Sequence, residues 1–326
     1  MNNKKKILLT EEILPPGLDL LRHRDDVELI VAENTDEQTL IDLAEDVHAI
    51  AVRMAKITAP LINAAPQLEI VSRHGVGCDN IDIDAMNARG LPVAIGAGAN
   101  DKSVAESALM LMLATSRRLI EQDKALREGR YAERNALSGN DCFGRHVLVI
   151  GFGRTGKSTA RVCKGIGMNV TVSDIALDSK AVEALGVDAV SDWRKILPTV
   201  DFVTVHVPLT NQTKHMIAEK ELADLPQGAI VINCARGGVI NEKHLCESLD
   251  KGHIAAAGLD VFESEPPPVD YYLFDRPDVI LTPHTAGTSR QALNDMSRMT
   301  MQNILDHFDG ALRPDCIFNG AALANR

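Results

Sequence analysis

The stretch HVLVIGFGRTGKSTARVCKGIGMNVTVSD, residues 146–174, decides the fold class of this chain. Its apolar, β-branched opening HVLVI predicts a strand, and three glycines follow it at Gly151, Gly153 and Gly156. The segment KSTARVCKGIG then predicts a helix, and NVTVS predicts a second strand that ends at Asp174. A strand, a glycine turn, a helix and another strand in this order predict a βαβ unit with parallel strands.

The glycine spacing predicts a dinucleotide site in this unit. Gly151 permits a tight turn, Gly153 lets the backbone approach a pyrophosphate, and Gly156 lets the helix and strand pack closely. The N–H groups at the helix start would face the phosphates. Asp174 would accept hydrogen bonds from ribose hydroxyls and would repel a 2′-phosphate, which favours NAD over NADP. A plain βαβ turn with chance glycines is the alternative, and the surrounding context argues against it. The cofactor-binding residues predicted within the motif are Gly151, Gly153, Arg154, Thr155, Gly156 and Asp174.

The rest of the chain alternates strand-like and helix-like segments in two series. The first hundred residues contain the strand-like runs KILLT, VELIVA, AIAV, LEIVS and LPVAI. A second series runs from residue 146 to residue 284. Long helices are expected from about Asp101 to Gly129 and from about Thr288 to Asp309, where the chain would cross between the two series. Strands and helices that alternate at this pitch predict parallel α/β sheets.

We therefore expect an α/β fold with two Rossmann-like or flavodoxin-like domains. The nucleotide-binding domain would comprise residues 101–287 and would be inserted into a substrate-binding domain of residues 1–100 and 288–326. The helix that starts near Asp101 is apolar around much of its early circumference, which suits a position between domains, a dimer interface or both. A homodimer is the expected assembly.

Composition excludes several other classes of protein. The 326 residues carry a net charge of −11, which argues against sequence-independent nucleic-acid binding. No apolar run reaches membrane-spanning length, and Glu11 and Glu12 interrupt the first apolar run, so neither a membrane protein nor a signal peptide is expected. The six cysteines show no C-x-x-C pair, and no metal site or disulfide framework is expected. A cytoplasmic protein with reduced, mostly buried cysteines follows.

Reactive side chains gather where the later strands of the second series end. Arg236 follows an apolar strand, Asp260 ends the next one with Glu263 and Glu265 just after it, and His284 ends the last. Open α/β sheets bind ligands at the carboxyl ends of their strands. An arginine can clamp a carboxylate, a histidine can take a hydroxyl proton, and a carboxylate can orient the imidazole. This set suits hydride transfer to or from a 2-hydroxy acid. His284 on its own would be weak evidence, because the chain has ten histidines.

Longer segments carry a family resemblance. They are GVGCDNIDIDAMNARGLPV, VIGFGRTG with VTVSD, VTVHVPLTNQT, VINCARGGVINEKHL, AAAGLDVFESEP and LTPHTAG, which span about residues 45–310. In this order they resemble the D-isomer-specific 2-hydroxyacid dehydrogenases, and most of all the D-3-phosphoglycerate dehydrogenase branch. The resemblance implies that Arg236, Glu265 and His284 are catalytic. Glu265 stands where the formate dehydrogenase relatives carry glutamine, which argues against them.

The resemblance also implies binding roles. Asp260 and the carbonyl of Cys234 would hold the nicotinamide carboxamide. The adenosine side would be lined by His206, Val207 and Pro208, and Thr213 would also bind the cofactor. Substrate contacts would come from Arg53, Arg73, His74, Gly75, Val76 and Gly77. Among these, the backbone from His74 to Gly77 would cradle the substrate carboxylate together with Arg236. Arg53 and Arg73 would face its distal, often phosphorylated end, with ordinary surface arginines as the alternative.

The expected function is NAD-dependent hydride transfer between a (D)-2-hydroxy acid and its 2-oxo acid, in a site between the two domains. A small anionic three-carbon acid such as 3-phosphoglycerate is the expected substrate. Hydroxypyruvate or glyoxylate reduction, sulfolactate oxidation and a non-enzymatic, NAD-sensing corepressor are the alternatives. Two residues depart from the family pattern: Thr155 replaces an aliphatic residue and His74 replaces a small one. No C-terminal regulatory domain is expected, because the sequence ends at Arg326.

Overall fold

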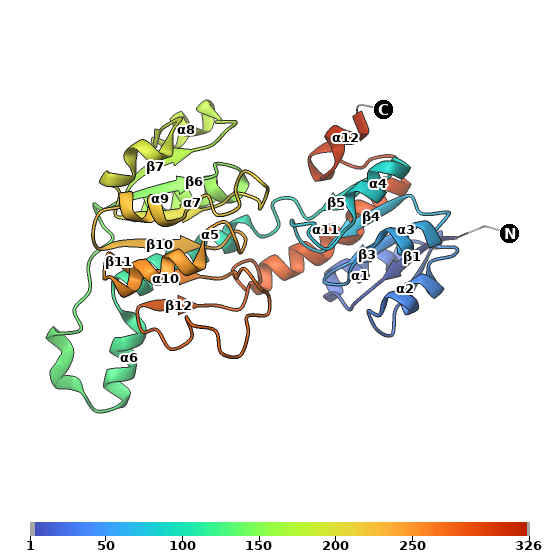
Figure 1. Cartoon of the computed structure of the whole chain (residues 1–326). Coiled ribbons are helices and arrows are strands. Elements are labelled where there is room, and N and C mark those ends of the chain that lie inside the picture. The colour runs from blue at the N-terminus through green and yellow to red at the C-terminus, as the bar shows by residue number, and fades with distance from the viewer. Residues whose placement is uncertain (1–3, 325–326) are drawn as a thin grey trace. The chain divides into compact units, whose positions relative to one another are not determined.

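The computed structural model describes residues 4–324 and divides into two compact units. The first unit contains the chain up to Asn100 and again from Thr288 onward, and the second contains Asp101–Gly287 (Figure 1). Residues 1–3 and 325–326 of the predicted substrate-binding domain lie outside the described residues. Each unit has one parallel sheet with helices on both faces, which confirms the predicted fold class.

The first unit holds a five-stranded sheet with the order β2-β1-β3-β4-β5. Its strands are β1 (Lys5–Leu9), β2 (Val27–Val31), β3 (Ala49–Val52), β4 (Ile70–Arg73) and β5 (Val93–Ile95). Its helices are α1 (Pro15–Leu18), α2 (Glu37–Leu43), α3 (Ala59–Ala64), α4 (Ile83–Arg89), α11 (Arg290–Phe308) and α12 (Gly320–Ala324). The strand order is that of flavodoxin-like folds, and it reverses between β1 and β3. Helix α11 packs against α1 and against β3, β4 and β5, so the second part of this unit completes the core begun by the first.

The second unit holds a seven-stranded sheet with the order β12-β11-β10-β9-β6-β7-β8. Its strands are β6 (His146–Ile150), β7 (Asn169–Ser173), β8 (Asp188–Ala189), β9 (Phe202–Val205), β10 (Ala229–Asn233), β11 (Ile254–Leu259) and β12 (Val279–Leu281). Its helices are α5 (Asp101–Ser116), α6 (Leu119–Arg127), α7 (Arg154–Gly165), α8 (Ser179–Leu185), α9 (Glu219–Asp224) and α10 (Glu242–Asp250). This is the Rossmann strand order, and it reverses between β6 and β9. The two-residue edge strand β8 was not expected from the sequence.

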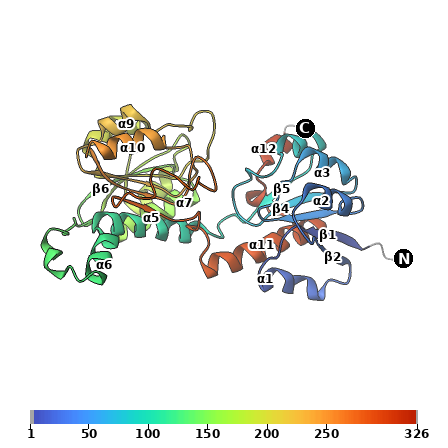
Figure 2. The ribbon, with the colours of Figure 1, turned by 60° about the horizontal axis from the view of Figure 1, so that its bottom comes forward.

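Helices cover both faces of the seven-stranded sheet. Helices α5 and α7 pack on one face, and α9 and α10 lie on the other (Figure 2). Every residue of β10 is buried, as are all four residues of β9. Strands that are covered on both sides read as continuous apolar runs, and this explains why the sequence signal in this region is strong.

The prediction of one long helix from Asp101 to Gly129 is wrong. The helix stops at Ser116, and α6 begins at Leu119 after a left-handed residue, Arg118, with φ 52°. The Ser116 carbonyl, which would accept a bond from the next helical turn, instead accepts the Asn140 amide at 2.8 Å. The guanidinium of Arg118 binds Glu121 and the Ala136 carbonyl. Contacts with a returning loop therefore override the helical spacing.

Five of the six cysteines are buried, and Cys246 is partly buried. Between residues 4 and 324, no helix is both long enough and apolar enough to cross a lipid bilayer.

Candidate active site

The glycine turn after β6 lies where the strand order of the second unit reverses. Gly151 has φ +95°, and a Cβ atom there would come within 2.6 Å of the His206 carbonyl oxygen. A Cβ atom on Gly156 would come within 1.9 Å of the Gly151 carbonyl oxygen. At Gly153, by contrast, a Cβ atom would meet nothing within 4 Å. Packing explains Gly151 and Gly156, whereas Gly153 borders open space at the N-terminus of α7, as a cofactor phosphate would require.

Asp174 braces this turn. Its carboxylate accepts the Phe152 amide at 2.6 Å and the Ala176 amide at 2.8 Å. A carboxylate offers about four acceptor positions, so two bonds leave capacity for ribose hydroxyls. The fully exposed side chain of Ile175 follows directly. The open space at Gly153, the helix N-terminus and this acceptor together fit a dinucleotide.

The other residues predicted to bind the cofactor occupy varied environments. Thr155, which departs from the family pattern, hydrogen-bonds Asp101 at the start of α5; burial raises the pKa of that aspartate. Thr213 donates its hydroxyl to the Pro208 carbonyl at 2.6 Å and thereby closes the loop after β9. Burial lowers the pKa of His206 to about 4, so its imidazole is neutral near pH 7. These contacts are made within the protein, and the cofactor contacts of these residues stay predictions.

Arg236 lies on a tightly braced turn after β10. The side chain of buried Asn233 donates to the Arg236 carbonyl at 2.9 Å, and the Arg236 guanidinium donates to the Ala235 carbonyl at 2.7 Å. A Cβ atom on Gly237 would lie 1.7 Å from the Phe262 carbonyl oxygen. Glycine is therefore needed here because the segment after β11 packs directly against this turn. The neighbouring thiol of Cys234 is buried, which raises its pKa.

His284 and Glu265 form a direct pair. The imidazole Nδ1 lies 2.7 Å from a carboxylate oxygen of Glu265. This contact raises the pKa of His284 above its ordinary value, although partial burial opposes the increase. For Glu265, partial burial opposes ionisation, but the bond to His284 and the amide of Phe262 hold the carboxyl pKa below its ordinary value. The charge of Arg236 acts on both groups: it lowers the pKa of His284 and that of Glu265. The structure thus brings the three predicted catalytic residues together.

Asp260 positions the histidine. Its carboxylate is 1% exposed and accepts the Thr282 hydroxyl at 2.6 Å and the amides of Thr285 and Ala286 at 2.8 and 2.9 Å. Its carbonyl accepts the His284 amide at 2.8 Å. His284 itself has a left-handed backbone, with φ 53°. The side chain of Asp260 thus holds the backbone of the loop that carries His284. A nicotinamide contact for Asp260 stays a prediction.

The residues predicted to bind substrate lie in the first unit, at or just after the carboxyl ends of β3 and β4. Arg53 has an exposed side chain, whereas the guanidinium of Arg73 binds its own loop at Asn80 and at the His74 carbonyl. His74 is buried, which lowers its pKa to about 4, and its imidazole is therefore neutral near pH 7. Gly75 has φ +145°, and Val76 and Gly77 are partly buried.

Glu11 fixes the turn that follows β3. Its carboxylate accepts the amides of Arg53, Met54 and Ala55 at 2.8–3.1 Å. Burial opposes its ionisation, but these amides hold the pKa of Glu11 below its ordinary value. Sequence reasoning missed this role, because Glu11 read only as the end of an apolar run.

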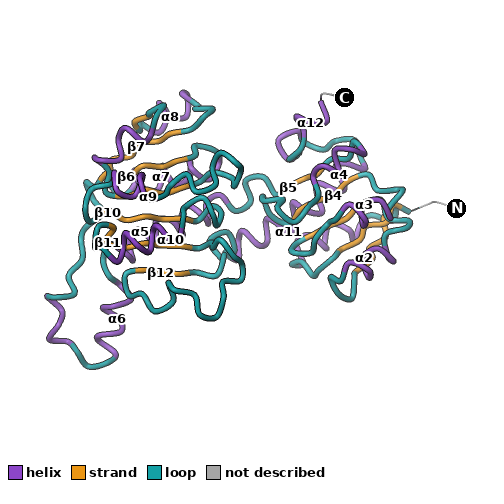
Figure 3. The backbone as a smooth tube through the Cα atoms, viewed as in Figure 1, coloured by secondary structure: helices purple, strands orange, loops and turns teal. Residues whose placement is uncertain are grey.

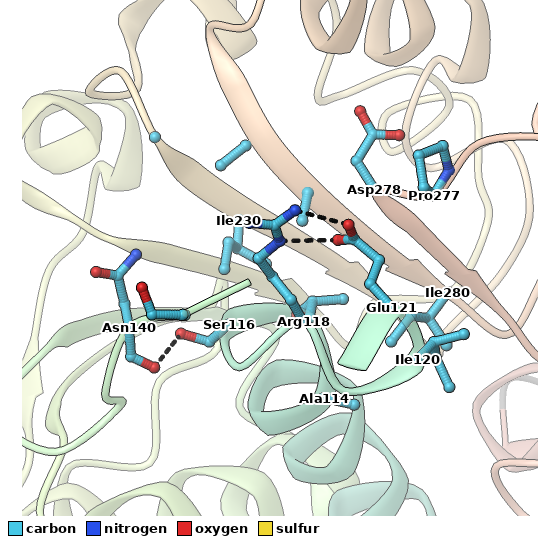
Figure 4. A pocket seen from close by; sticks show the side chains of 16 residues that line it. Ala114, Ser116, Arg118, Ile120, Glu121, Asn140, Ile230, Pro277, Asp278 and Ile280 are labelled. Atoms are coloured by element: carbon cyan, nitrogen blue, oxygen red, sulfur yellow. Dashed lines mark hydrogen bonds and ion pairs between the residues drawn. The ribbon is translucent and has the colours of Figure 1, made fainter. Parts of the chain in front are cut away.

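A cavity of about 330 Å³ lies elsewhere in the second unit (Figure 4). It is lined by residues before or at the start of β10, β11 and β12, such as Gly228, Ala255 and Asp278, and by the break between α5 and α6. These are the amino ends of the strands, so the cavity lies at the opposite edge of the sheet from the glycine turn and His284. It contains none of the predicted site residues.

Comparisons with known proteins identify the family of this chain. A sequence model described as "D-isomer specific 2-hydroxyacid dehydrogenase, NAD binding domain" matches residues 109–286. The chain is 37% identical over 306 residues to a D-3-phosphoglycerate dehydrogenase of Archaeoglobus fulgidus, covering 94% of this chain but only 58% of that protein. It is 34% identical to a glyoxylate reductase of Korarchaeum cryptofilum, covering 96% of both.

Solved structures extend the similarity to three dimensions. The holo form of D-mandelate dehydrogenase from Rhodotorula graminis superposes with a TM-score of 0.86 at 30% identity, covering 94% of each chain. The match to the family's NAD-binding domain includes both the glycine turn and the Arg236, Glu265 and His284 cluster. The chain therefore belongs to the D-isomer-specific 2-hydroxyacid dehydrogenase family.

Proposed function

We propose that this chain catalyses reversible hydride transfer between NAD and a D-2-hydroxy acid. The observation that carries the proposal is the His284–Glu265 pair beside Arg236, in the same unit as a glycine turn that fits a dinucleotide. NAD, when bound, supplies the hydride acceptor or donor. The residues predicted to hold it are those of the glycine turn together with Asp174, whose carboxylate would accept hydrogen bonds from ribose hydroxyls.

Each catalytic residue has a distinct role in this proposal. Neutral His284 removes the C2 hydroxyl proton during oxidation, and protonated His284 returns it during reduction. Glu265 stabilises the imidazolium through its 2.7 Å contact with Nδ1. Arg236 binds the substrate carboxylate with its forked guanidinium. Asp260 does not react, and it holds the backbone of the histidine loop.

We further propose that the first unit binds the substrate and that the substrate is a small anionic acid, with 3-phosphoglycerate as the first candidate. The exposed guanidinium of Arg53 supports a charged distal group. Glyoxylate and hydroxypyruvate are the second candidates, because a glyoxylate reductase is 34% identical to this chain, nearly as similar as the D-3-phosphoglycerate dehydrogenase at 37%.

A panel of 2-oxo acids tests this function through NADH oxidation by the full chain. The panel contains 3-phosphohydroxypyruvate, hydroxypyruvate, glyoxylate and 3-sulfopyruvate. His284→Ala should lower kcat at least about a hundredfold on whichever acid is reduced. Near-normal turnover by this variant would remove His284 from the mechanism. Tight NADH binding without turnover, combined with recruitment of a peptide partner, would favour the corepressor alternative.

We also propose a homodimer. Large apolar side chains of α5 and α6 are exposed in the single chain: Met110, Leu113, Leu119, Ile120 and Leu126. Exposed apolar side chains that form a contiguous patch mark protein interfaces. Light scattering during size-exclusion chromatography should give twice the chain mass of 35.3 kDa. Leu119→Glu combined with Ile120→Glu should yield monomers, and a monomeric wild-type protein would contradict the proposal.

A further inference from the structure

A buried carboxylate outside the proposed catalytic set forms hydrogen bonds with the segment that carries Glu265. Glu242 is the first residue of α10 and is only 5% exposed. Its carboxylate accepts the Glu263 amide at 2.6 Å and the hydroxyl of Tyr271. In return, the Glu242 amide donates to the Glu263 carboxylate at 3.1 Å. The two glutamates are thus joined by reciprocal bonds between backbone and side chain.

These hydrogen bonds anchor the segment that carries Glu265. It follows β11 within a long irregular loop (Figure 3). The Phe262 amide donates to Glu265 at 3.1 Å, and the next amide, that of Glu263, donates to Glu242. The Phe262 carbonyl abuts Gly237 in the arginine turn. The Phe262 ring also meets the Tyr271 ring edge to face, with centroids 5.8 Å apart.

Glu263 extends the network to the loop after β9. Its carboxylate lies 3.1 Å from Nε2 of His215, and Nδ1 of that imidazole lies 3.2 Å from the side chain of Asn241. Asn241 caps α10 by accepting the His244 amide at 2.9 Å. One network therefore ties together the loop after β9, the start of α10 and the segment that carries Glu265.

We propose that Glu242 is a positioning residue that holds Glu265 against His284. This inference rests on the proposed function, since it assumes that the His284–Glu265 pair is the reactive one. A charge kept in a buried site needs partners, and both partners of Glu242 belong to the loop between β11 and β12. The negative charge also suits the N-terminus of α10. Removing it would release the segment and lengthen the contact between Glu265 and the imidazole.

The pKa of His284 reports this contact directly. Glu265 and Asp260 raise the pKa of His284, whereas burial and the charge of Arg236 lower it. Burial and the charges of Glu263 and Glu265 raise the pKa of Glu242, whereas the hydrogen bonds from the Tyr271 hydroxyl and the Glu263 amide lower it. Histidine labelled with ¹³C at Cε1 and observed by NMR gives this pKa without any need for turnover. His284→Asn identifies the resonance among the ten histidines.

Three variants of the full chain are compared. Glu265→Gln should lower the pKa of His284 by at least about one unit, since it removes the neighbouring charge. Glu242→Gln should lower it by at least about half a unit, and Tyr271→Phe should shift it in the same direction by less. Glu183→Gln on exposed α8 is the matched control and should leave it unchanged. The NADH dissociation constant should stay within about twofold in every variant, because the glycine turn is untouched.

The outcomes distinguish a failure of the positioning role of Glu242 from a failure of the proposed catalytic pair. If Glu265→Gln lowers the pKa and Glu242→Gln leaves it unchanged while lowering Tm, Glu242 is merely structural and the inference is overturned. If Glu265→Gln itself has no effect, the proposed catalytic pair fails, and the inference fails with it. Should Glu242→Gln not fold, Tyr271→Phe decides: an unchanged pKa of His284 refutes the positioning role.

Discussion

The glycine turn allows packing to be separated from cofactor binding by two single-methyl substitutions. At Gly156, the Cβ atom of alanine would lie 1.9 Å from the Gly151 carbonyl oxygen. At Gly153, it would meet nothing within 4 Å. The first substitution should therefore damage the fold, and the second should damage only the binding of a molecule that needs the open space.

The magnitudes follow from these contacts. A carbon and an oxygen need roughly 3.3 Å, so α7 must retreat from the turn by more than 1 Å in Gly156→Ala, and no rotamer change can relieve a clash with backbone. Overpacking of this kind costs about 3 kcal/mol or more. In a unit of this size the loss corresponds to a decrease in Tm of roughly 6–12 °C. Gly153→Ala should leave Tm unchanged within about 2 °C but should raise the NADH dissociation constant at least about tenfold.

Thermal unfolding and fluorescence titration with NADH measure these two quantities separately. Gly165→Ala, at the exposed end of α7 with nothing within 4 Å, is the matched control, and it should stabilise slightly and leave NADH binding intact. Unchanged NADH affinity in Gly153→Ala would refute the placement of the cofactor at this turn. A Tm within about 2 °C of wild type in Gly156→Ala would refute the packing argument.

Three further outcomes follow from the site. Asp174→Ala should raise the ratio of kcat/KM with NADPH to that with NADH at least about tenfold, because it removes the repelling carboxylate. Glu265 raises the pKa of His284 above 6.5. In initial-rate profiles, kcat/KM for oxo-acid reduction should therefore fall only as pH passes that higher pKa, and kcat/KM for hydroxy-acid oxidation should rise over the same range. Arg53→Ala should raise KM for 3-phosphohydroxypyruvate at least about tenfold more than KM for glyoxylate. Arg73→Ala should chiefly lower Tm, because the Arg73 guanidinium binds its own loop.

The parts of the fold that could be predicted are those set by local pattern. Strands buried on both faces gave continuous apolar runs, and the glycine spacing located the turn after β6. The positions of Arg236 and His284 followed from the rule that parallel strands deliver their carboxyl ends to one edge of a sheet. Each of these inferences uses neighbours in sequence or the general geometry of a sheet.

The parts that could not be predicted depend on distant partners. The helix break at Arg118 requires a loop that returns about twenty residues later to bind the Ser116 carbonyl. Glu242 looked like an ordinary acidic residue at a helix start, and its burial depends on Tyr271, far along the chain. The role of Glu11 also depends on distant partners, because the amides that it accepts follow β3. Sequence spacing carries no information on such pairings.

Buried anchors rather than the reactive groups themselves should determine stability at this site. His284 and Glu265 are 50% and 37% exposed, and ion pairs of that kind contribute only about 0–1 kcal/mol. The Asp260 carboxylate is 1% exposed and accepts three hydrogen bonds. In Asp260→Asn, an amide N–H group would face one of these donors, at a cost of about 1–3 kcal/mol.

Asp260→Asn should therefore lower both Tm and kcat, whereas His284→Asn should lower kcat with Tm nearly unchanged. Differential scanning calorimetry together with initial rates on the same samples measures the contrast. A loss of Tm in His284→Asn as large as that in Asp260→Asn would show that the exposed pair holds the loop as strongly as the buried Asp260 does. The loop conformation would then depend on the reactive groups, and the left-handed backbone of His284 would need another support.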